Sequence, residues 1–323
     1  MKTLIVPCAG GRIIDSRPIF LNRHPDGELL AIKAVLGVIP QNYDRIVYTV
    51  LKETDTKYNA KNEILEANHG RFPIEVLLLD TKTKGPAETV YETIKQANID
   101  GEFAVRDSHA YISIDKELEG NYIAGLNLTK YEKPIEHLRG KSFIVLNEQG
   151  QTLDVVEKHF CSDVISVGLY GFKKTTDFLM AYEHLNDPNY PIDKLFVSHI
   201  ISYLIGYKRR VFHSVLVTEF EDWASKTSWQ RVQKNYSTCF LDLDNICNCE
   251  FPLEGGLLKA LIQLSNAGVR FVPFTTKESD LGMGKYLLQQ GINVLSIVCN
   301  CSTSKIKTLA CSEEDVMEMT LEI

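Results

Sequence analysis

Short apolar runs alternate with segments of helical periodicity over the first 150 residues of the chain. Five runs are typical of buried strands, at residues 4–7, 44–51, 74–80, 102–107 and 141–147. Between them, three segments carry apolar residues three and four positions apart, at 29–38, 57–70 and 86–97. This alternation predicts an α/β fold: a mixed, mainly parallel, Rossmann-like sheet with helices on both of its faces.

The pattern changes further along the chain. After residue 150, strand-like segments surround two expected helices at 175–185 and 193–206, which predicts an antiparallel extension of the same domain. A second unit begins near Tyr236, with expected strands and helices at 237–244, 255–268, 269–276, 284–291 and 293–300. We therefore predict two domains, residues 1–235 and residues 236–323, the second of which is small and also α/β.

Composition narrows the classes of partner. The net charge of −7 gives no basic surface for nucleic acid, and no apolar run approaches the length of a membrane span. Residues 1–11 are typical of a first strand and its loop rather than of a signal peptide. The eight cysteines do not suggest a small disulfide-stapled secreted protein, so we expect a cytoplasmic chain with reduced thiols. The sequence leaves a homo-oligomer open.

Three loops follow predicted strands at the sheet edge where ligands bind in such folds: residues 8–12, 80–85 and 107–109. In the first loop, Gly10 and Gly11 allow the backbone to approach a phosphate chain closely, and Arg12 offers a guanidinium fork. An ordinary tight turn explains two glycines equally well, so this loop alone does not define a site.

Two aspartates strengthen the case for a phosphate site. Asp107 ends a buried strand and Asp222 stands among apolar and aromatic residues, and a carboxylate at either place is costly without a cation. A helix cap or a surface acid explains each residue taken singly. Together they fit a hard cation such as Mg²⁺, which neutralises phosphate charge in nucleotidyl transfer.

Residues 1–235 resemble the nucleotidyltransferase superfamily, whose members join a nucleoside triphosphate to a sugar phosphate or a similar phosphorylated acceptor. Six motifs stand in that family's order: the strand and glycine-rich loop (4–12), a Thr-Lys-Gly loop (83–85), an aspartate that ends a strand (107), a Glu-Lys pair (157–158), a glycine strand (167–172) and an Asp-Trp turn (222–223).

The resemblance implies a role for each motif. Ala9, Gly10 and Gly11 bind the nucleotide phosphates, with Arg12 on the leaving phosphates. Thr83, Lys84 and Gly85 contact the base, and Glu157, Lys158 and Gly168 contact the acceptor. Asp107 and Asp222 hold Mg²⁺ and, with Arg12, form the catalytic set. The implied partners are therefore an NTP and a phosphorylated small molecule.

A bacterial sub-family from capsule or surface-polysaccharide gene clusters is the most similar in detail. It shares the His-Pro-Asp-Gly turn of residues 24–27 and the Ser-His-Ile-Ile helix of residues 198–201. Its members also carry a haloacid-dehalogenase-like domain at the C-terminus. The resemblance therefore implies nucleotidyl transfer in surface-polysaccharide precursor synthesis.

The chain departs from the family in its phosphate chemistry. The family's Pro-Lys pair reads Pro18-Ile19, so a lysine is missing, and Arg17 and Arg23 are the flanking cations. The glycine-rich loop is short, and the usual Asp-x-Asp ends in His109. A slow enzyme and a non-catalytic protein that binds nucleotides or nucleotide sugars both stay open.

The predicted second domain resembles the haloacid dehalogenase superfamily, with several of that family's motifs incomplete, and it has no cap domain. Its first motif matches Asp242 and Asp244, the nucleophile and the proton-handling acid, and Thr275 or Thr276 matches the second motif. The later lysine and acidic pair have only loose matches, at residues 305 or 307 and 313–315. Phosphatase activity and a silent domain are the two alternatives.

Two Cys-x-Cys pairs, Cys247 with Cys249 and Cys299 with Cys301, follow predicted strands in this second domain. If the parallel strands bring both pairs to one edge, four thiolates suit tetrahedral Zn²⁺. The spacing is tighter than the usual Cys-x₂-Cys, and half-buried thiols in a loop are the simpler interpretation.

Overall fold

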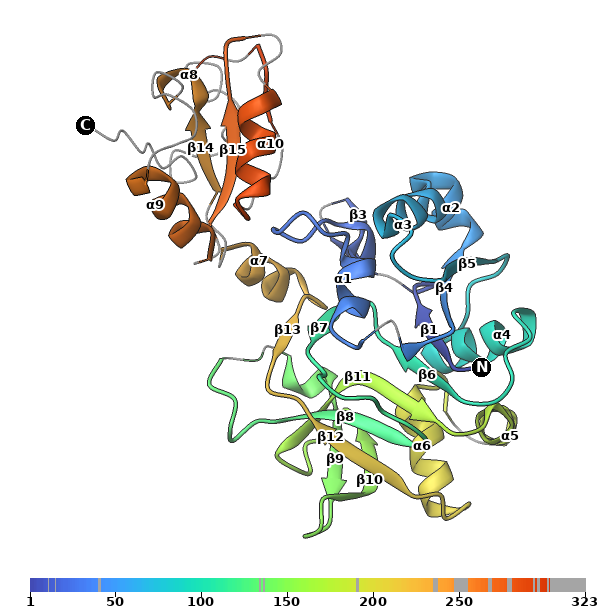
Figure 1. Cartoon of the computed structure of the whole chain (residues 1–323). Coiled ribbons are helices and arrows are strands. Elements are labelled where there is room, and N and C mark those ends of the chain that lie inside the picture. Colours follow the sequence, from blue (N-terminus) through green and yellow to red (C-terminus); the bar gives the residue numbers. More distant parts are fainter. Residues whose placement is uncertain are drawn as a thin grey trace. The chain divides into compact units, whose positions relative to one another are not determined.

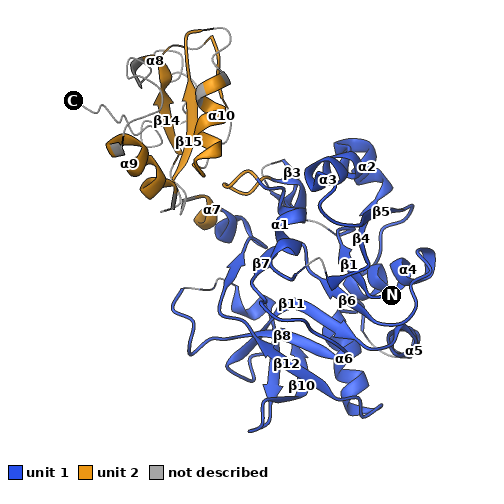
Figure 2. Ribbon diagram, in the orientation of Figure 1, with its two compact units in different colours: residues 1–22, 28–229 blue, residues 23–27, 230–323 orange. Residues whose placement is uncertain are grey.

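The computed structural model describes residues 1–10, 12–14, 16–39, 42–133, 135, 137–189, 192–234, 238–246, 255–266, 269–277, 281–292, 294, 297–300 and 302. The chain divides into two compact units, residues 1–22 with 28–229 and residues 23–27 with 230–323 (Figure 2). The division after Trp229 lies inside helix α7 (Lys226–Lys234). The predicted boundary at 235/236 lies outside the described residues, so the two domains with those bounds remain a prediction.

A nine-stranded sheet forms the centre of the first unit within the described residues (Figure 1). In spatial order its strands are β5 (Ile74–Leu79), β4 (Arg45–Leu51), β1 (Thr3–Pro7), β6 (Phe103–Arg106), β11 (Val164–Phe172), β8 (Tyr122–Asn127), β12 (Phe212–Leu216), β10 (Gln151–Glu157) and β9 (Ser142–Leu146). Strands β5, β4, β1 and β6 are parallel, and β11 pairs antiparallel with β6, β8 and β9. The predicted mixed sheet is confirmed, but it is not mainly parallel, because antiparallel neighbours are as frequent as parallel ones along this strand order.

Helices cover both faces of this sheet because side chains alternate between two hydrophobic cores. In β1, Leu4 and Val6 belong to one core and Ile5 to the other. The first core includes residues of α1 (Leu30–Leu36) and α3 (Ala60–Asn68). The second includes residues of α4 (Pro86–Gln96), α5 (Thr175–Leu185) and α6 (Val197–Gly206). The prediction of helices on both faces is therefore confirmed.

Two details of the first unit differ from the sequence-based expectation. The helix expected over 57–70 is present as α3, which ends before His69 as predicted but begins only at Ala60, because Asn59, with a φ of 53°, separates it from α2 (Lys52–Tyr58). Helix α2 buries none of its residues and so carries no apolar stripe. Strand β8 was also missed, although five of its six residues are buried.

The second unit contains the parallel pair β14 (Thr238–Asp242) and β15 (Arg270–Phe274). Helices α9 (Gly255–Asn266) and α10 (Leu281–Gln289) contribute Leu261 and Leu287 to its small core. The strand expected over 237–244 ends at Asp242, where helix α8 (Leu243–Ile246) begins. None of the helices in the described part of the chain is long and apolar enough to span a bilayer.

Candidate active site

A cleft of about 570 Å³ lies in the first unit, lined by loops that follow β1, β5 and β6 and by residues of β10 and β11. Its lining includes most of the residues predicted from the sequence: Gly10, Arg12, Thr83, Lys84, Gly85, Asp107, Glu157, Lys158 and Gly168. Ala9 is buried, with 4% of its surface exposed, and Gly11 lies outside the described residues. Motifs from distant parts of the chain thus share one cavity.

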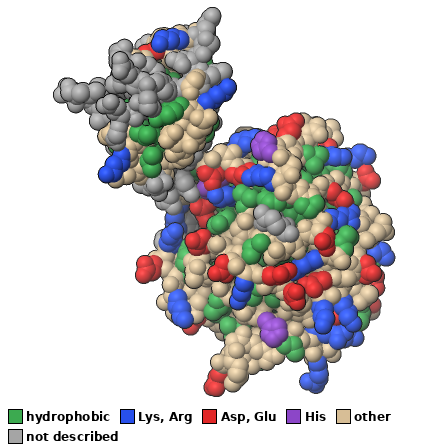
Figure 3. Space-filling model, viewed as in Figure 1, with side chains coloured by type: hydrophobic (Ala, Val, Ile, Leu, Met, Phe, Trp, Pro, Cys, Tyr) green, Lys and Arg blue, Asp and Glu red, His purple; other side chains and the backbone are tan. Residues whose placement is uncertain are grey.

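The cleft is strongly positive. Among its described lining residues, the Lys and Arg side chains outnumber the carboxylates of Asp107 and Glu157; they are Arg12, Lys82, Lys84, Lys141, Lys158 and Lys194. The whole chain carries a net charge of −7, and Figure 3 shows acidic and basic side chains interspersed on the face of the first unit that it presents. This local excess of cations favours a polyanionic ligand, because charges of one sign in a cleft add up in its field.

The glycine-rich loop leaves room for a ligand. A Cβ atom built on Gly10 has no protein atom within 4 Å, so the space beside this backbone is open. Arg12 lines the cleft and donates a hydrogen bond from Nη1 to the Ala224 carbonyl, at 2.8 Å. The guanidinium is thereby tied to the turn that follows Asp222.

The Thr83–Gly85 loop is held against the segment that leads into α6. A Cβ atom on Gly85 would collide with the Leu195 carbonyl, so only glycine permits this close approach. The Thr83 hydroxyl lies 2.7 Å from that of Thr89, one turn into α4. The backbone amide of Lys84 also donates to the Glu88 carboxylate. These contacts fix the shape of the loop at the cleft wall.

Asp107 and Gly168 both line the cleft and are in contact with each other. The Asp107 amide donates to the Gly168 carbonyl at 2.8 Å. Gly168 has a φ of +76°, and a Cβ atom there would overlap the Asp107 carboxylate. His109, which replaces the second acid of the usual pair, has Nε2 3.9 Å from Asp107 Oδ2.

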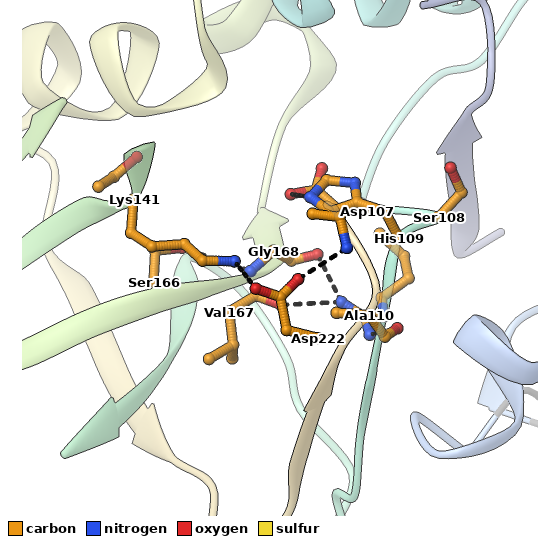
Figure 4. A network of polar contacts seen from close by, with 12 residues as sticks. Asp107, Ser108, His109, Ala110, Lys141, Ser166, Val167, Gly168 and Asp222 are labelled. Atoms are coloured by element: carbon orange, nitrogen blue, oxygen red, sulfur yellow. Dashed lines mark hydrogen bonds and ion pairs between the residues drawn. The ribbon is translucent and has the colours of Figure 1, made fainter. Parts of the chain in front are cut away.

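Asp222 reaches the same region through a second, two-stranded sheet. Strand β13 (Phe220–Asp222) pairs antiparallel with β7 (Ala110–Ile112), which sets Asp222 opposite Ala110 (Figure 4). Trp223 is fully buried, and its indole Nε1 donates to the Ser108 carbonyl at 3.2 Å. These contacts bring Asp222 to the loop of Asp107, although the two are far apart in sequence.

Glu157 and Lys158 also line the cleft. Glu157 ends β10, and one of its oxygens accepts hydrogen bonds from the hydroxyls of Ser142 and Ser198, the latter at 2.6 Å. The Lys158 ammonium lies 3.6 Å from the other Glu157 oxygen and 3.8 Å from the centroid of the Phe196 ring. The Ser198 contact gives a structural reason for the Ser-His-Ile-Ile helix noted in the sequence.

Two further charged residues with contacts around the cleft were not predicted from the sequence. Arg106 is fully buried, and its guanidinium donates to the carbonyls of Ala34, Ala110, Val167 and Gly168, at 2.9–3.0 Å for three of these oxygens. Burial lowers the pKa of Arg106 to about 10, so the group stays charged at neutral pH. Lys141 donates to Asp222 Oδ2 at 2.7 Å (Figure 4). In the sequence, an arginine inside an apolar strand was the one available signal for Arg106.

An apolar residue, Ile19, occupies the position where the resembled family has a lysine. Ile19 lines the cleft and is 3% exposed. Arg17 donates twice to the Glu63 carboxylate, at 2.8 Å each, and is not among the described lining residues of the cleft. Arg23 belongs to the second unit and donates to the Gly27 carbonyl at 3.0 Å.

The predicted ligands for a divalent ion are the carboxylates of Asp107 and Asp222. Asp107 and Asp222 supply two carboxylates, and among the described residues no group of three or more His, Cys, Asp or Glu side chains could hold a metal ion. Mg²⁺ commonly takes one or two carboxylates and completes its shell with phosphate oxygens and water. Asp107 lines the cleft, whereas Asp222 is not among its described lining residues, so the Mg²⁺ site on these two carboxylates stays a prediction.

In the second unit, Asp244 is bound by the loop that follows β15. Its two oxygens accept from the Thr275 hydroxyl at 2.6 Å and from the amide and hydroxyl of Thr276 at 2.7 Å. The Asp244 amide in turn donates to Asp242 Oδ1 at 3.0 Å. The predicted acids and threonines therefore lie together at the ends of β14 and β15.

The zinc hypothesis rests mostly on residues outside the described part of the chain. Cys247, Cys249 and Cys301 lie there, as do the predicted lysine and acidic positions at 305–315. Cys299 is described and is a free, partly exposed thiol. The four-cysteine site stays a prediction.

Comparison with known proteins gives a result at the level of structure. A scan against models of protein families found no match, and a search of curated proteins found no match either. The nucleoside-diphosphate-sugar pyrophosphorylase from Vibrio cholerae RC9 matches with a TM-score of 0.58 and 19% identity, over 71% of this chain and 99% of its own. The inositol-1-phosphate CTP transferase from T. maritima matches with a TM-score of 0.54 and 10% identity, over 72% and 96%.

A third solved structure, a UDP-glucose pyrophosphorylase complexed with UDP-glucose, matches with a TM-score of 0.55 and 15% identity, over 72% of this chain and 97% of its own. Each of the three likenesses covers 71–72% of this chain and nearly all of the other chain. The chain therefore has the nucleotidyltransferase fold. The resemblance inferred from the sequence motifs is confirmed for the fold.

Proposed function

We propose that this protein is a nucleotidyltransferase that transfers a nucleoside monophosphate from an NTP to a sugar phosphate or a similar phosphorylated acceptor. The observation that carries the proposal is the single cleft, which gathers the phosphate loop, the Thr83–Gly85 loop, Asp107 and the Glu157–Lys158 pair. Its excess of lysine and arginine suits the combined charge of a triphosphate and a phosphorylated acceptor.

In the proposed reaction, a phosphate oxygen of the acceptor attacks the α-phosphorus of the NTP in line with the bond that breaks. The bond from the α-phosphorus to the oxygen that bridges it to the β-phosphorus is cleaved, and pyrophosphate leaves with both electrons of that bond. Arg12 binds the leaving phosphates, and Glu157 and Lys158 orient the acceptor. Such catalysis consists mainly of positioning and charge stabilisation.

Asp107 and Asp222 are the residues that would hold Mg²⁺ in this scheme. The ion supplies charge neutralisation of the phosphates when bound. Gly168 keeps the Asp107 carboxylate in place, because any side chain at that position would overlap it. The Asp222 carboxylate is held by the Ala224 amide at 3.0 Å.

The test is release of pyrophosphate from each of the four NTPs in the presence of Mg²⁺ and a panel of acceptors that includes glucose 1-phosphate and inositol 1-phosphate. We expect one NTP and acceptor pair to release pyrophosphate and yield the diphosphate-linked product. The matched control is Asp107→Asn, which keeps the size of the side chain. Measurable nucleotide binding without any release from the unmodified protein would instead identify a non-catalytic protein that binds nucleotides or nucleotide sugars.

The biological setting that we propose is the synthesis of activated precursors for a surface polysaccharide in the cytoplasm. It rests on the sub-family resemblance of the turn at residues 24–27 and the helix at 198–201. The product of the proposed reaction, a nucleoside diphosphate joined to a small molecule, is the activated form that glycosyl-type transfer consumes.

A second activity is proposed for the C-terminal unit: phosphatase chemistry of the haloacid-dehalogenase type through Asp242. The contacts that join Asp242, Asp244 and Thr275 favour it. Asp242 would attack phosphorus and Asp244 would handle the proton of the leaving group. Hydrolysis of p-nitrophenyl phosphate by the whole chain should be lost in Asp242→Asn, and unchanged hydrolysis in that variant would exclude this residue as the nucleophile.

A further inference from the structure

Ile19 stands where the nucleotidyltransferase family has a lysine, so the positive charge of that lysine is missing here. Another cation of the cleft is a candidate to replace it. Of the two arginines that flank Ile19, Arg17 is bound by Glu63 and does not line the cleft. Arg23 donates to the Gly27 carbonyl within the second unit. The remaining cations are those of the cleft wall itself.

Lys141 differs from the other cations of the described lining. Its side chain is 14% exposed, whereas the other five lysine and arginine residues are classed as exposed. An ammonium removed from water in this way needs a fixed anionic partner. Asp222 is that partner, with 2.7 Å between Nζ and Oδ2 (Figure 4).

The backbone of Lys141 contacts the Glu157–Lys158 pair, and its side chain contacts Asp222. Its carbonyl accepts from the Lys158 amide at 3.1 Å, and its own amide donates to the Leu138 carbonyl at 3.0 Å. The next residue, Ser142, donates to the Glu157 carboxylate. The side chain runs the other way, to Asp222, with Nζ 5.4 Å from the Phe220 ring centroid. Lys141 therefore spans from the acceptor pair to the aspartate of the phosphate-transfer region.

We propose that Lys141 is a catalytic residue that takes over the charge lost at position 19. In the protein without ligand, its ammonium neutralises Asp222. When an NTP and a divalent ion occupy the cleft, the ammonium exchanges its contact with Asp222 for an oxygen of the phosphate that is being transferred, and stabilises the negative charge that grows there. This proposal rests on the nucleotidyl transfer proposed above.

Two consequences follow from a lysine that shares Asp222 with a divalent ion. Removal of the ammonium slows the transfer step, because charge stabilisation in the transition state is lost. Removal also leaves Asp222 without a counter-cation, so the protein without nucleotide binds a divalent ion more tightly. The second effect is independent of turnover.

The kinetic experiment compares Lys141→Met with Arg17→Gln and Arg23→Gln, using the NTP and acceptor pair found in the pyrophosphate screen. We expect Lys141→Met to lower kcat by about 10²–10³-fold, with KM for the NTP changed much less. Arg17→Gln and Arg23→Gln should keep kcat within about twofold of the unmodified protein. A full loss in Arg17→Gln or Arg23→Gln and none in Lys141→Met would overturn the assignment.

A rescue variant separates a catalytic role from a structural one. Ile19 lines the cleft, so a lysine introduced there reaches the same cavity. Ile19→Lys in the Lys141→Met background should restore kcat by about tenfold or more, since it returns a cation to the family's usual position. A stability change alone would not be reversed in this way. Thermal melting of each variant checks folding, and the absence of rescue in a folded double variant counts against the proposal.

The metal experiment uses Mn²⁺ alone as the probe, titrated into the nucleotide-free whole chain and followed by the EPR signal of free Mn²⁺. We expect Lys141→Met to bind Mn²⁺ about tenfold more tightly than the unmodified protein, and Lys141→Met with Asp222→Asn to lose that gain. Equal Mn²⁺ affinity in Lys141→Met and the unmodified protein would overturn the sharing of Asp222. If the unmodified protein releases no pyrophosphate with any NTP and acceptor pair, the proposed function is refuted, and so is the role of Lys141 in the transfer step. The Mn²⁺ titration does not depend on turnover, so it tests the sharing of Asp222 separately.

Discussion

The amide of Asp107 donates to the carbonyl of Gly168 at 2.8 Å, while the missing side chain of Gly168 leaves the space that the Asp107 carboxylate fills. Asp107 directly follows β6, and Gly168 lies in the middle of β11, the antiparallel neighbour of β6. The position of one proposed metal ligand thus depends on a glycine from another strand.

Gly168→Ala should therefore displace Asp107. The positive φ alone costs about 1 kcal/mol for alanine, and the overlap with the carboxylate adds to it. We expect loss of most pyrophosphate release and lower stability in urea denaturation. Gly150→Ala is the matched control, because Gly150 has the same φ of +76° and no atom within 4 Å of a built Cβ. Equal effects of the two substitutions would refute the role of the overlap.

Arg106→Met should destabilise the first unit strongly. The change leaves four backbone carbonyls, those of Ala34, Ala110, Val167 and Gly168, without this donor in the interior. We expect a loss of about 3–5 kcal/mol in the free energy of unfolding, because an unpaired buried polar group costs about 1–3 kcal/mol. Urea denaturation measures it.

The control for that change is Arg45→Met. Arg45 donates to the Glu75 carboxylate and to the Ala97 carbonyl, but its side chain is 23% exposed and water can replace the lost bonds. We expect a loss of about 1 kcal/mol or less. A loss in Arg106→Met no larger than in Arg45→Met would contradict a large contribution of the four buried Arg106 hydrogen bonds to stability.

Gly85→Ala should distort the Thr83–Gly85 loop, because its Cβ would meet the Leu195 carbonyl. We expect weaker nucleotide binding in thermal-shift titrations, together with a loss of about 1–3 kcal/mol from overpacking. Gly206→Ala, where a Cβ meets nothing within 4 Å, should leave nucleotide binding unchanged. Nucleotide binding of Gly85→Ala equal to that of the unmodified chain would show that this loop does not contact the nucleotide.

Asp244 should make the stability of the second unit sensitive to acid. Hydrogen bonds from Thr275 and Thr276 lower the pKa of Asp244 to about 2, below the unfolded value of 3.8. Its carboxylate therefore stabilises the folded state above about pH 4, and this contribution is lost as the pH falls from about 4 to 2. NMR titration of the Asp244 carboxyl measures the pKa, and Thr275→Ala should raise it toward 3.8. An unperturbed value in the unmodified protein would contradict these contacts.

Local pattern alone predicted much of the fold. The apolar runs gave β1, β4, β5, β6 and β9, because a strand buried on both faces must be apolar over its whole length. Helix α2 was not predictable, since it buries no residue and its separation from α3 depends on the single backbone conformation of Asn59.

Part of the candidate site was likewise predictable from the sequence, and part was not. The sequence by itself determined which loops reach the cleft, because the carboxyl ends of parallel strands lie on one edge. The family resemblance implied Gly168 and the Glu157–Lys158 pair, and the structure places them in the lining of the same cleft as Asp107. Only the tertiary structure decided that Lys141 forms an ion pair with Asp222 and that Arg17 forms one with Glu63. It also decided that Arg106 donates hydrogen bonds to four backbone carbonyls. Those contacts join residues far apart in the chain, and no periodicity or spacing encodes which distant partner a charged side chain finds once the sheet has formed.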